Sequence, residues 1–171
     1  MDDTSEGPRP ATPEEPTRLY TALENNTQSI RLFRIAPDSG DQLVLELKVF
    51  LLESTDSPPF ASLSYMWGSD DPCHDVIIND IPLKVRPNAF LFLNTLRDHQ
   101  RRRIEGGSKG LPRCPSGGCI EWIWMDSICI NQLDPNERNH QVGMMQKIYG
   151  LAEHVIFHIG PDTCAAQRCL E

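Results

Sequence analysis

Apolar residues alternate with polar ones through much of the first half of the chain, which is the spacing of β-strands. Residues 29–37 (SIRLFRIAP) and 42–53 (QLVLELKVFLLE) are rich in apolar positions, and four turn-forming residues separate them. They predict a β-hairpin. A second hairpin is predicted over 75–86, with its turn at the Asn-Asp pair in the middle. Between the hairpins, the short apolar run 60–68 (FASLSYMWG) predicts a buried strand.

Two stretches of the second half have the three- and four-residue spacing of helices. Helices are predicted over 87–99 and 135–152, because in each stretch the apolar residues fall on one face. The residues that define these faces are Phe90, Leu93, Leu96 and Arg97 in the first helix and Val142, Met145, Tyr149 and Ala152 in the second. The apolar runs 121–130 and 154–161 predict two further buried strands.

The order of these elements predicts the fold class and the domain limits. Strands that alternate with amphipathic helices indicate an α/β domain, with a partly parallel sheet covered by helices and with N-terminal and internal β-hairpins. The domain is expected over 18–161, after a disordered, acidic and Pro-rich tail at 1–17. Five glycines in the segment 100–120 predict a flexible insertion loop. The last residues, 162–171, are interpreted as the start of a further helix that is cut short.

Composition narrows the possible partners. The chain has 171 residues and a net charge of -8, which opposes binding to nucleic acid or to anionic lipid. It has no segment of roughly 20 apolar residues that could span a bilayer, and its start does not resemble a signal peptide. We therefore expect a soluble, cytoplasmic protein with no membrane partner. The six cysteines are expected to be reduced.

Metal binding is not predicted. Cys114 and Cys119 have four residues between them, as do Cys164 and Cys169, and His74 could add a ligand. The two-residue spacing of zinc knuckles is absent from both pairs.

Candidate ligand-binding residues follow two of the expected strands. In open α/β sheets ligands gather at the carboxyl ends of the strands, so the loops that follow 60–68 and 121–130 are the candidate site. Ser64 and Trp67 belong to the first segment, although Trp67 could equally pack in the core. Asp126 directly follows an apolar run, and an acid in that place needs a hydrogen-bond partner or a ligand.

The segment after Asp126 has two interpretations. Asp134 can cap a helix that begins at Pro135, with Glu137 reaching back to the backbone N–H of the cap residue. Glu137 can alternatively be a catalytic acid. Asn131 is a turn former on the first interpretation and a ligand-binding residue on the second.

Three stretches together resemble the fungal heterokaryon incompatibility domain, or HET domain. They are IRLFRIAP, FASLSYMWG and the long block WIWMDSICINQLDPNERNHQVGMMQKIYGLAEHVIFHIGP. The likeness covers about Ile30 to Pro161, with departures from the family pattern at Met125 and His158. It implies a signalling or effector module in non-self recognition and programmed cell death, acting through protein partners or self-association.

A more distant similarity to TIR domains implies a flavodoxin-like sheet and a possible second function. Some TIR domains cleave NAD, so NAD is a possible substrate here, and no bound cofactor is expected. On that interpretation Asp126 and Glu137 are the catalytic acids, while Ser64, Trp67 and Asn131 bind the nucleotide. The TIR catalytic glutamate itself would correspond to Glu171, the last residue, so we expect this activity to be incomplete.

Overall fold

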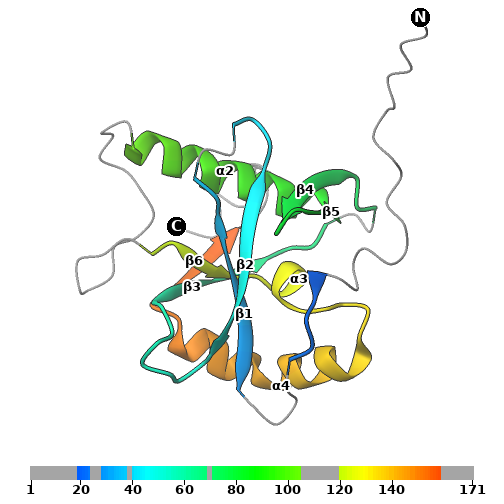
Figure 1. Cartoon of the computed structure of the whole chain (residues 1–171), viewed down its shortest axis with the longest axis vertical. Helices are drawn as coiled ribbons and strands as arrows, with labels where there is room; N and C mark the ends of the chain where they lie inside the picture. Colours follow the sequence, from blue (N-terminus) through cyan, green and yellow to red (C-terminus); the bar gives the residue numbers. More distant parts are fainter. Residues whose placement is uncertain (1–18, 24–27, 38–39, 69–70, 105–119, 159–171) are drawn as a thin grey trace, which may run out of the picture.

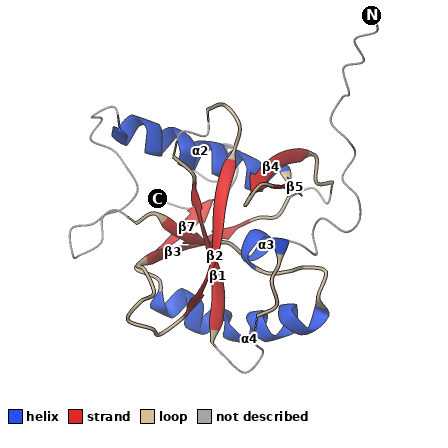
Figure 2. Cartoon of the chain, in the orientation of Figure 1, coloured by secondary structure: helices blue, strands red, loops and turns tan. Residues whose placement is uncertain are grey.

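The computed structural model describes residues 19–23, 28–37, 40–68, 71–104 and 120–158. Seven strands form one sheet in the order β5-β4-β2-β1-β6-β3-β7 (Figures 1 and 2). The strands are β1 (Ser29–Ile35), β2 (Val44–Leu51), β3 (Phe60–Tyr65), β4 (His74–Ile78), β5 (Ile81–Val85), β6 (Trp122–Trp124) and β7 (His154–His158). The helices are α2 (Pro87–Ile104), α3 (Asp126–Cys129) and α4 (Pro135–Leu151). The predicted α/β class and the partly parallel sheet are confirmed.

Both predicted hairpins are present. β1 and β2 pair antiparallel from Ser29 opposite Leu51 to Ile35 opposite Leu45. β4 and β5 pair antiparallel around Asn79 and Asp80, which have φ values of 49° and 66°. Asparagine and aspartate tolerate positive φ, as a two-residue hairpin turn requires.

Strands β6, β3 and β7 pair parallel with one another, as β2 and β4 also do. Ser62 of β3 lies opposite Trp124 of β6 on one side and Val155 of β7 on the other. These three side chains therefore share one face of the sheet. Trp124 contacts Tyr149 of α4, with ring centroids 5.6 Å apart, so α4 covers this face.

Helix α2 covers the opposite face. His158 of β7 lies opposite Tyr65 of β3, and the side chain of Tyr65 points to the other face of the sheet from that of its neighbour Ser64. The ring of His158 contacts the ring of Phe92 in α2, with the two centroids 5.7 Å apart. Figure 1 shows α2 and α4 on opposite sides of the strands. The core lies in these two layers. Its fully buried apolar side chains include Ile30, Leu32, Phe33, Leu45, Leu63, Ile78, Leu93, Ile123, Trp124 and Met125.

The prediction of a strand over 121–130 is wrong for most of that segment. Only Trp122–Trp124 form a strand, and Asp126–Cys129 form the single helical turn α3. The Asp126 Oδ1 atom accepts the N–H of Ser127 at 2.7 Å, and the Cys129 N–H donates to the Met125 carbonyl at 2.8 Å. A short apolar run fits a buried strand and a buried helical turn equally well, so the pattern alone could not separate them.

The expected helix and loop around residue 100 also need correction. Helix α2 continues from Pro87 to Ile104, so the expected end near His99 and the expected loop start at residue 100 are both too early. The rest of the expected loop, 105–119, lies outside the described residues, as do the expected tail 1–17 and the expected partial helix 162–171.

Two predicted faces differ from those in the structure. Val142 of α4 is 53% exposed, whereas the buried residues of this helix are Glu137, Gln141 and Ile148. The expected buried strand 154–161 is instead an edge strand over its described residues, with Val155 and Phe157 exposed. Apolar spacing predicts the wrong face of α4, because the buried face of this helix is lined partly by polar residues that have buried partners elsewhere in the chain.

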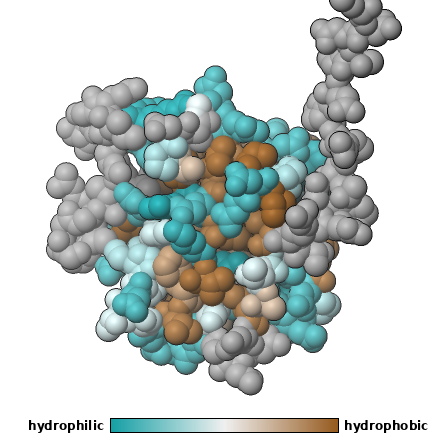
Figure 3. Space-filling view, in the orientation of Figure 1, coloured by the Kyte–Doolittle hydropathy of each residue, from teal (hydrophilic) through white to brown (hydrophobic). Residues whose placement is uncertain are grey.

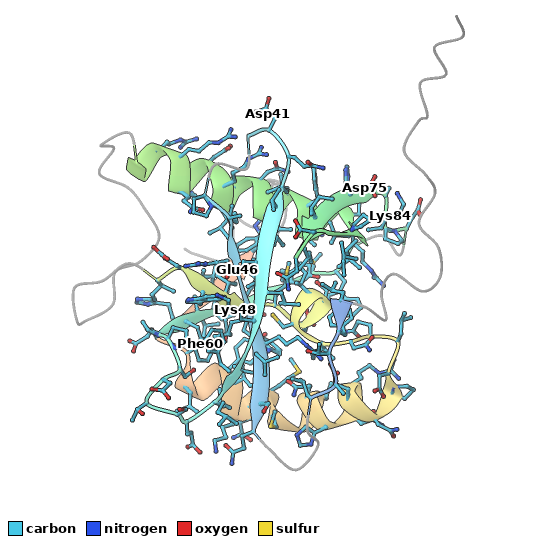
Figure 4. The ribbon with its side chains drawn as sticks, in the orientation of Figure 1. Asp41, Glu46, Lys48, Phe60, Asp75 and Lys84 are labelled. Carbon is cyan, nitrogen blue, oxygen red and sulfur yellow. The ribbon has the colours of Figure 1, made fainter. Side chains whose placement is uncertain are left out.

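Charged side chains on the β1–β2 hairpin form a surface network. Glu46 accepts from Arg34 and from Lys48 at 2.5 Å each, and the hydrogen bond from Lys48 is the largest effect that lowers the pKa of Glu46. Figure 4 labels Glu46 and Lys48 on β2, and also the exposed Asp75–Lys84 pair at 3.0 Å. Exposed pairs of this kind contribute only about 0–1 kcal/mol each.

The surface mixes polar and apolar residues. Figure 3 shows hydrophobic residues reaching the surface between polar ones on the face that it presents. Within the described residues, no helix has the length and the apolar character that crossing a bilayer requires.

Candidate functional site

The carboxyl ends of β3 and β6 lie side by side, as the sequence predicted. Just beyond these ends, the Trp67 Nε1 atom donates to Asp126 Oδ2 at 3.0 Å. The Tyr65 hydroxyl donates to the Ser127 hydroxyl at 2.6 Å. These two hydrogen bonds join the end of β3 to α3. We call Tyr65, Trp67, Asp126 and Ser127 the β3–α3 cluster.

A positively charged side chain just before α2 lies against the β3–α3 cluster. The guanidinium of Arg86, the residue before α2, lies 4.5 Å from the ring centroid of Trp67. The Asn88 side chain donates to the Met66 carbonyl at 2.9 Å. Gly68 has a φ of +73°, and a Cβ atom there would lie 2.7 Å from Asn88 Nδ2. Glycine at position 68 therefore lets the chain leave β3 close to α2.

Burial controls the electrostatics of the cluster. Burial raises the pKa of Asp126 above its usual value, while the Trp67 hydrogen bond, the Ser127 N–H and Arg86 oppose this rise. Burial also raises the pKa of Tyr65 to about 12, so its hydroxyl stays protonated at neutral pH. The cluster thus holds a half-buried carboxyl that accepts from an indole, and a guanidinium lies against that indole. Such a group can hydrogen-bond to a hydroxyl or an amide of a ligand, and perturbed carboxyls of this kind are common in functional sites.

Ser64 lies on the other face of β3 from Tyr65. Its side chain is hydrogen-bonded to Tyr149 of α4, whose hydroxyl also donates to the Leu63 carbonyl at 3.1 Å. The charge of Asp126 helps to raise the pKa of Tyr149, after the larger effect of burial. Ser64 therefore bonds to Tyr149 on the α4 face, while Trp67 contacts Asp126 directly.

Glu137 belongs to a buried ion pair. Its two carboxylate oxygens accept from Arg31 at 2.6 and 3.0 Å, and Arg31 and Glu137 are only 1% and 4% exposed. The Glu137 carboxylate also accepts the N–H of Asn131 at 2.7 Å. Asp134 caps α4 as predicted, accepting the N–H groups of Asn136 and Glu137. The expected return bond from Glu137 to the cap residue is wrong, because its carboxylate binds Arg31 and Asn131 instead.

Arg31 ties several segments to this pair. One of its nitrogens donates to the Cys129 carbonyl at 3.1 Å, and another donates to the Thr21 carbonyl at 2.6 Å. The ring of Tyr20 lies 5.0 Å below the guanidinium, and the Tyr20 hydroxyl donates to the Ile128 carbonyl at 3.0 Å. The last carbonyls of α3 are thereby satisfied by side chains from the start of the described chain.

Sequence reasoning did not select Arg31 as a site residue. The available signal was an arginine among apolar residues, in SIRLF, within a strand that buries both of its faces. A charged side chain in that setting requires a buried counter-charge, but its partner lies 106 residues away along the chain.

Four of the five predicted site residues thus form two pairs at the two ends of α3, and Ser64 bonds to Tyr149 of α4 instead. Trp67 and Asp126 meet at the start of α3. Asn131 and Glu137 meet at its end. Gln132 connects the groups, because its side chain donates to the Asp126 carbonyl at 2.9 Å.

Comparison with known proteins identifies the family of the chain. The family model described as heterokaryon incompatibility protein (HET) matches residues 60–170, from the start of β3 onward. The chain belongs to the HET family. It is 30% identical over 159 residues to "Heterokaryon incompatibility protein 6, OR allele" of Neurospora crassa, across 88% of this chain and 21% of that protein. The chain therefore spans about a fifth of the length of this relative. No solved structure matches it.

The HET match includes the β3–α3 cluster and Glu137 but not Arg31, which precedes residue 60. The cysteines considered for zinc, at 114, 119, 164 and 169, lie outside the described residues. Across the part of the chain that is described, no three His, Cys, Asp or Glu side chains form a group that could hold a metal ion.

Substituting one member of the buried ion pair should greatly destabilise the domain. Glu137→Ala leaves the Arg31 guanidinium buried without its counter-charge, and we expect a loss of about 3–5 kcal/mol in the free energy of unfolding. The double variant Arg31→Met/Glu137→Leu removes both charges and should regain part of that loss, because no buried charge is left unpaired although the Cys129 and Thr21 carbonyls lose their donor. Urea denaturation of the parent and variants measures both effects. Equal losses in the single and double variants would contradict the assigned role.

The raised pKa of Asp126 makes stability depend on pH in a defined direction. The unfolded carboxyl titrates near pH ~3.9, and burial raises its folded pKa above that value. Its stabilising contribution is complete below the unfolded pKa and is lost as the pH rises through the folded pKa. Asp126→Asn cannot ionise but keeps an oxygen for Trp67.

We therefore expect Asp126→Asn to become more stable relative to the parent as the pH rises from about 3.5 to 7. Denaturant unfolding of both proteins across this range gives the difference directly. A difference that stays constant or changes in the opposite direction shows that the carboxyl is not strained by burial.

Proposed function

We propose that this chain is a signalling or effector module of fungal non-self recognition, acting in the cytoplasm to trigger cell death. The observation that carries the proposal is the HET match over 60–170, supported by a relative named as a heterokaryon incompatibility protein. The module acts through protein partners or through self-association. The acidic net charge of -8 supports contact with proteins over contact with nucleic acid.

The geometry around α3 supports a protein-contact role for its loops. Met66 is 63% exposed beside the β3–α3 cluster, and Leu133 is 72% exposed just before α4. Both lie in short segments whose neighbours are held firmly, by Asn88 on one side and by the Asp134 cap on the other. Exposed apolar side chains on rigid supports lose little freedom when they bind a partner.

Expression in a filamentous fungus tests this role. We expect the 171-residue chain to arrest growth or kill the cells, and Trp67→Ala to weaken this effect because it removes the contact that joins β3 to α3. Val49→Ala, which changes an exposed apolar residue on the distant hairpin, serves as the control and should act as the parent does. Growth unaffected by a parent chain that accumulates as folded protein would contradict the effector role.

A second candidate function is cleavage of NAD in a TIR-like manner. The observation that favours it is the β3–α3 cluster, where a carboxyl of raised pKa meets an indole at the carboxyl ends of parallel strands. The Asp126 carboxylate would hold a ribose hydroxyl or stabilise the oxocarbenium-like charge that develops as neutral nicotinamide leaves, and Trp67 would stack on a base. Glu137 already accepts from Arg31 and Asn131, so it would act by positioning the loop at Asn131.

Incubating the purified chain with NAD tests this candidate. Release of nicotinamide, followed by chromatography, should be lost in Asp126→Asn and kept in Glu46→Gln, a substitution in the surface network of the hairpin. An absence of nicotinamide at high protein concentration, or equal release by Asp126→Asn, would remove this candidate.

A further inference from the structure

Strand β7 presents an unusual edge. It pairs with β3 along its whole length, and it is the last strand on its side of the sheet as the described residues define it. Every second residue of an edge strand turns its backbone N–H and C=O away from the sheet. Two large apolar side chains lie on the same strand: Val155 is 38% exposed and Phe157 is 72% exposed. Both share the α4 face of the sheet with Ser62 and Trp124.

The strand lacks most of the features that usually protect an edge. Sheet edges are commonly blocked by lysine, by inward-pointing charges, by proline or by a bulge. The sequence of β7 is His-Val-Ile-Phe-His, with no lysine, acid or proline. Its register with β3 runs without interruption from His154 to His158, so it contains no bulge. An edge with these properties is suited to pairing with another strand.

The residue pattern of β7 is self-complementary. If two β7 strands pair antiparallel about Ile156, Val155 of each copy lies opposite Phe157 of the other, and His154 lies opposite His158. The Val–Phe pairs then fall side by side on the α4 face. Aromatic and β-branched side chains form favourable cross-strand pairs. A two-fold axis requires this kind of complementarity, in which one patch matches itself.

We propose that the β7 edge is the surface through which two copies of this chain associate, with the strands antiparallel and the two-fold axis at Ile156. The two seven-stranded sheets then form one continuous sheet. This inference rests on the self-association included in the proposed function and assigns it a surface.

A second copy matches the residue pattern of this edge. Its β7 strand can lie antiparallel about Ile156, which brings Val155 of one copy opposite Phe157 of the other, whereas a parallel neighbour would not do so. Only the antiparallel arrangement of two identical strands matches the symmetry of the sequence. The interface is short, so we expect a reversible dimer rather than an obligate one.

Sedimentation of the 171-residue chain over a range of concentrations tests the proposal. The parent should be dimeric at concentrations on the order of 100 µM, and Phe157→Glu should weaken the dimer by about tenfold or more, because it places a charge in each cross-strand pair. Val49→Glu is the control, since Val49 is also an exposed apolar residue on a strand but lies on β2 of the distant hairpin. It should dimerise as the parent does. Circular dichroism shows whether each variant is folded.

Cross-linking tests the register and does not depend on the folding of the glutamate variant. Val155→Cys mixed with Phe157→Cys should form a disulfide-linked dimer under mild oxidation, because residues 155 and 157 of the two copies lie opposite each other. Each variant alone should do so much less, since like residues are then diagonal. The unsubstituted chain gives the background from its own cysteines, of which Cys73 is exposed.

Three results would overturn or separate the proposals. A parent that stays monomeric at every concentration overturns the β7 dimer. A dimer that Phe157→Glu leaves intact and that gives no 155–157 cross-link shows that another surface is used, and self-association then remains while the β7 assignment fails. A β7 dimer in a chain that has no effect on fungal growth contradicts the proposed function and leaves this inference standing.

Discussion

The buried ion pair between Arg31 and Glu137 is the interaction on which the rest of the domain depends. It joins β1 to the first turn of α4, and through Arg31 it also holds the Cys129 carbonyl at the end of α3 and the Thr21 carbonyl near the start of the described chain. Both side chains are almost fully buried, so neither charge can be solvated by water. Each is compensated by the other and by the peptide groups around it, and the ring of Tyr20 lies next to the guanidinium. The strand, the turn and the helix must therefore be assembled together.

This constraint determines the geometry of the candidate site. Helix α3 has only four residues, which is too short to be stable by itself. Its end is held by Arg31 and Tyr20, and its first residue, Asp126, is held by Trp67 and Gln132. The position of the Asp126 carboxyl opposite the indole therefore follows from contacts made by residues distant in sequence. A substitution at Arg31 would therefore also shift the β3–α3 cluster, because α3 connects the two.

Local chemistry made part of this structure predictable, and long-range contacts made the rest unpredictable. The turn at Asn79-Asp80 and the cap at Asp134 were correct, because each depends on residues within a few positions. The parallel pairing of β3 with β6 followed from the alternation of strands and helices, and it brought Trp67 and Asp126 together as expected. By contrast, α3 was expected to be strand, and Val142 was expected to be buried. Both errors arise because buried polar contacts between distant residues fix these segments. Arg31 holds the end of α3, and the Gln141 side chain of α4 donates to the Ser29 carbonyl at 2.9 Å.

The buried pair also bears on which part of the chain can fold as a unit. The HET match begins at residue 60, so it contains Glu137 but not the strand that carries Arg31. A segment limited to the matched residues would bury the Glu137 carboxylate without its cation, or would have to leave the start of α4 exposed to water. It would also lose β1, which pairs with β6 at Phe33 and Ile123 and lies between β2 and β6 in the sheet. The β1–β2 hairpin therefore belongs to the same sheet as the candidate site, although the family match starts after it.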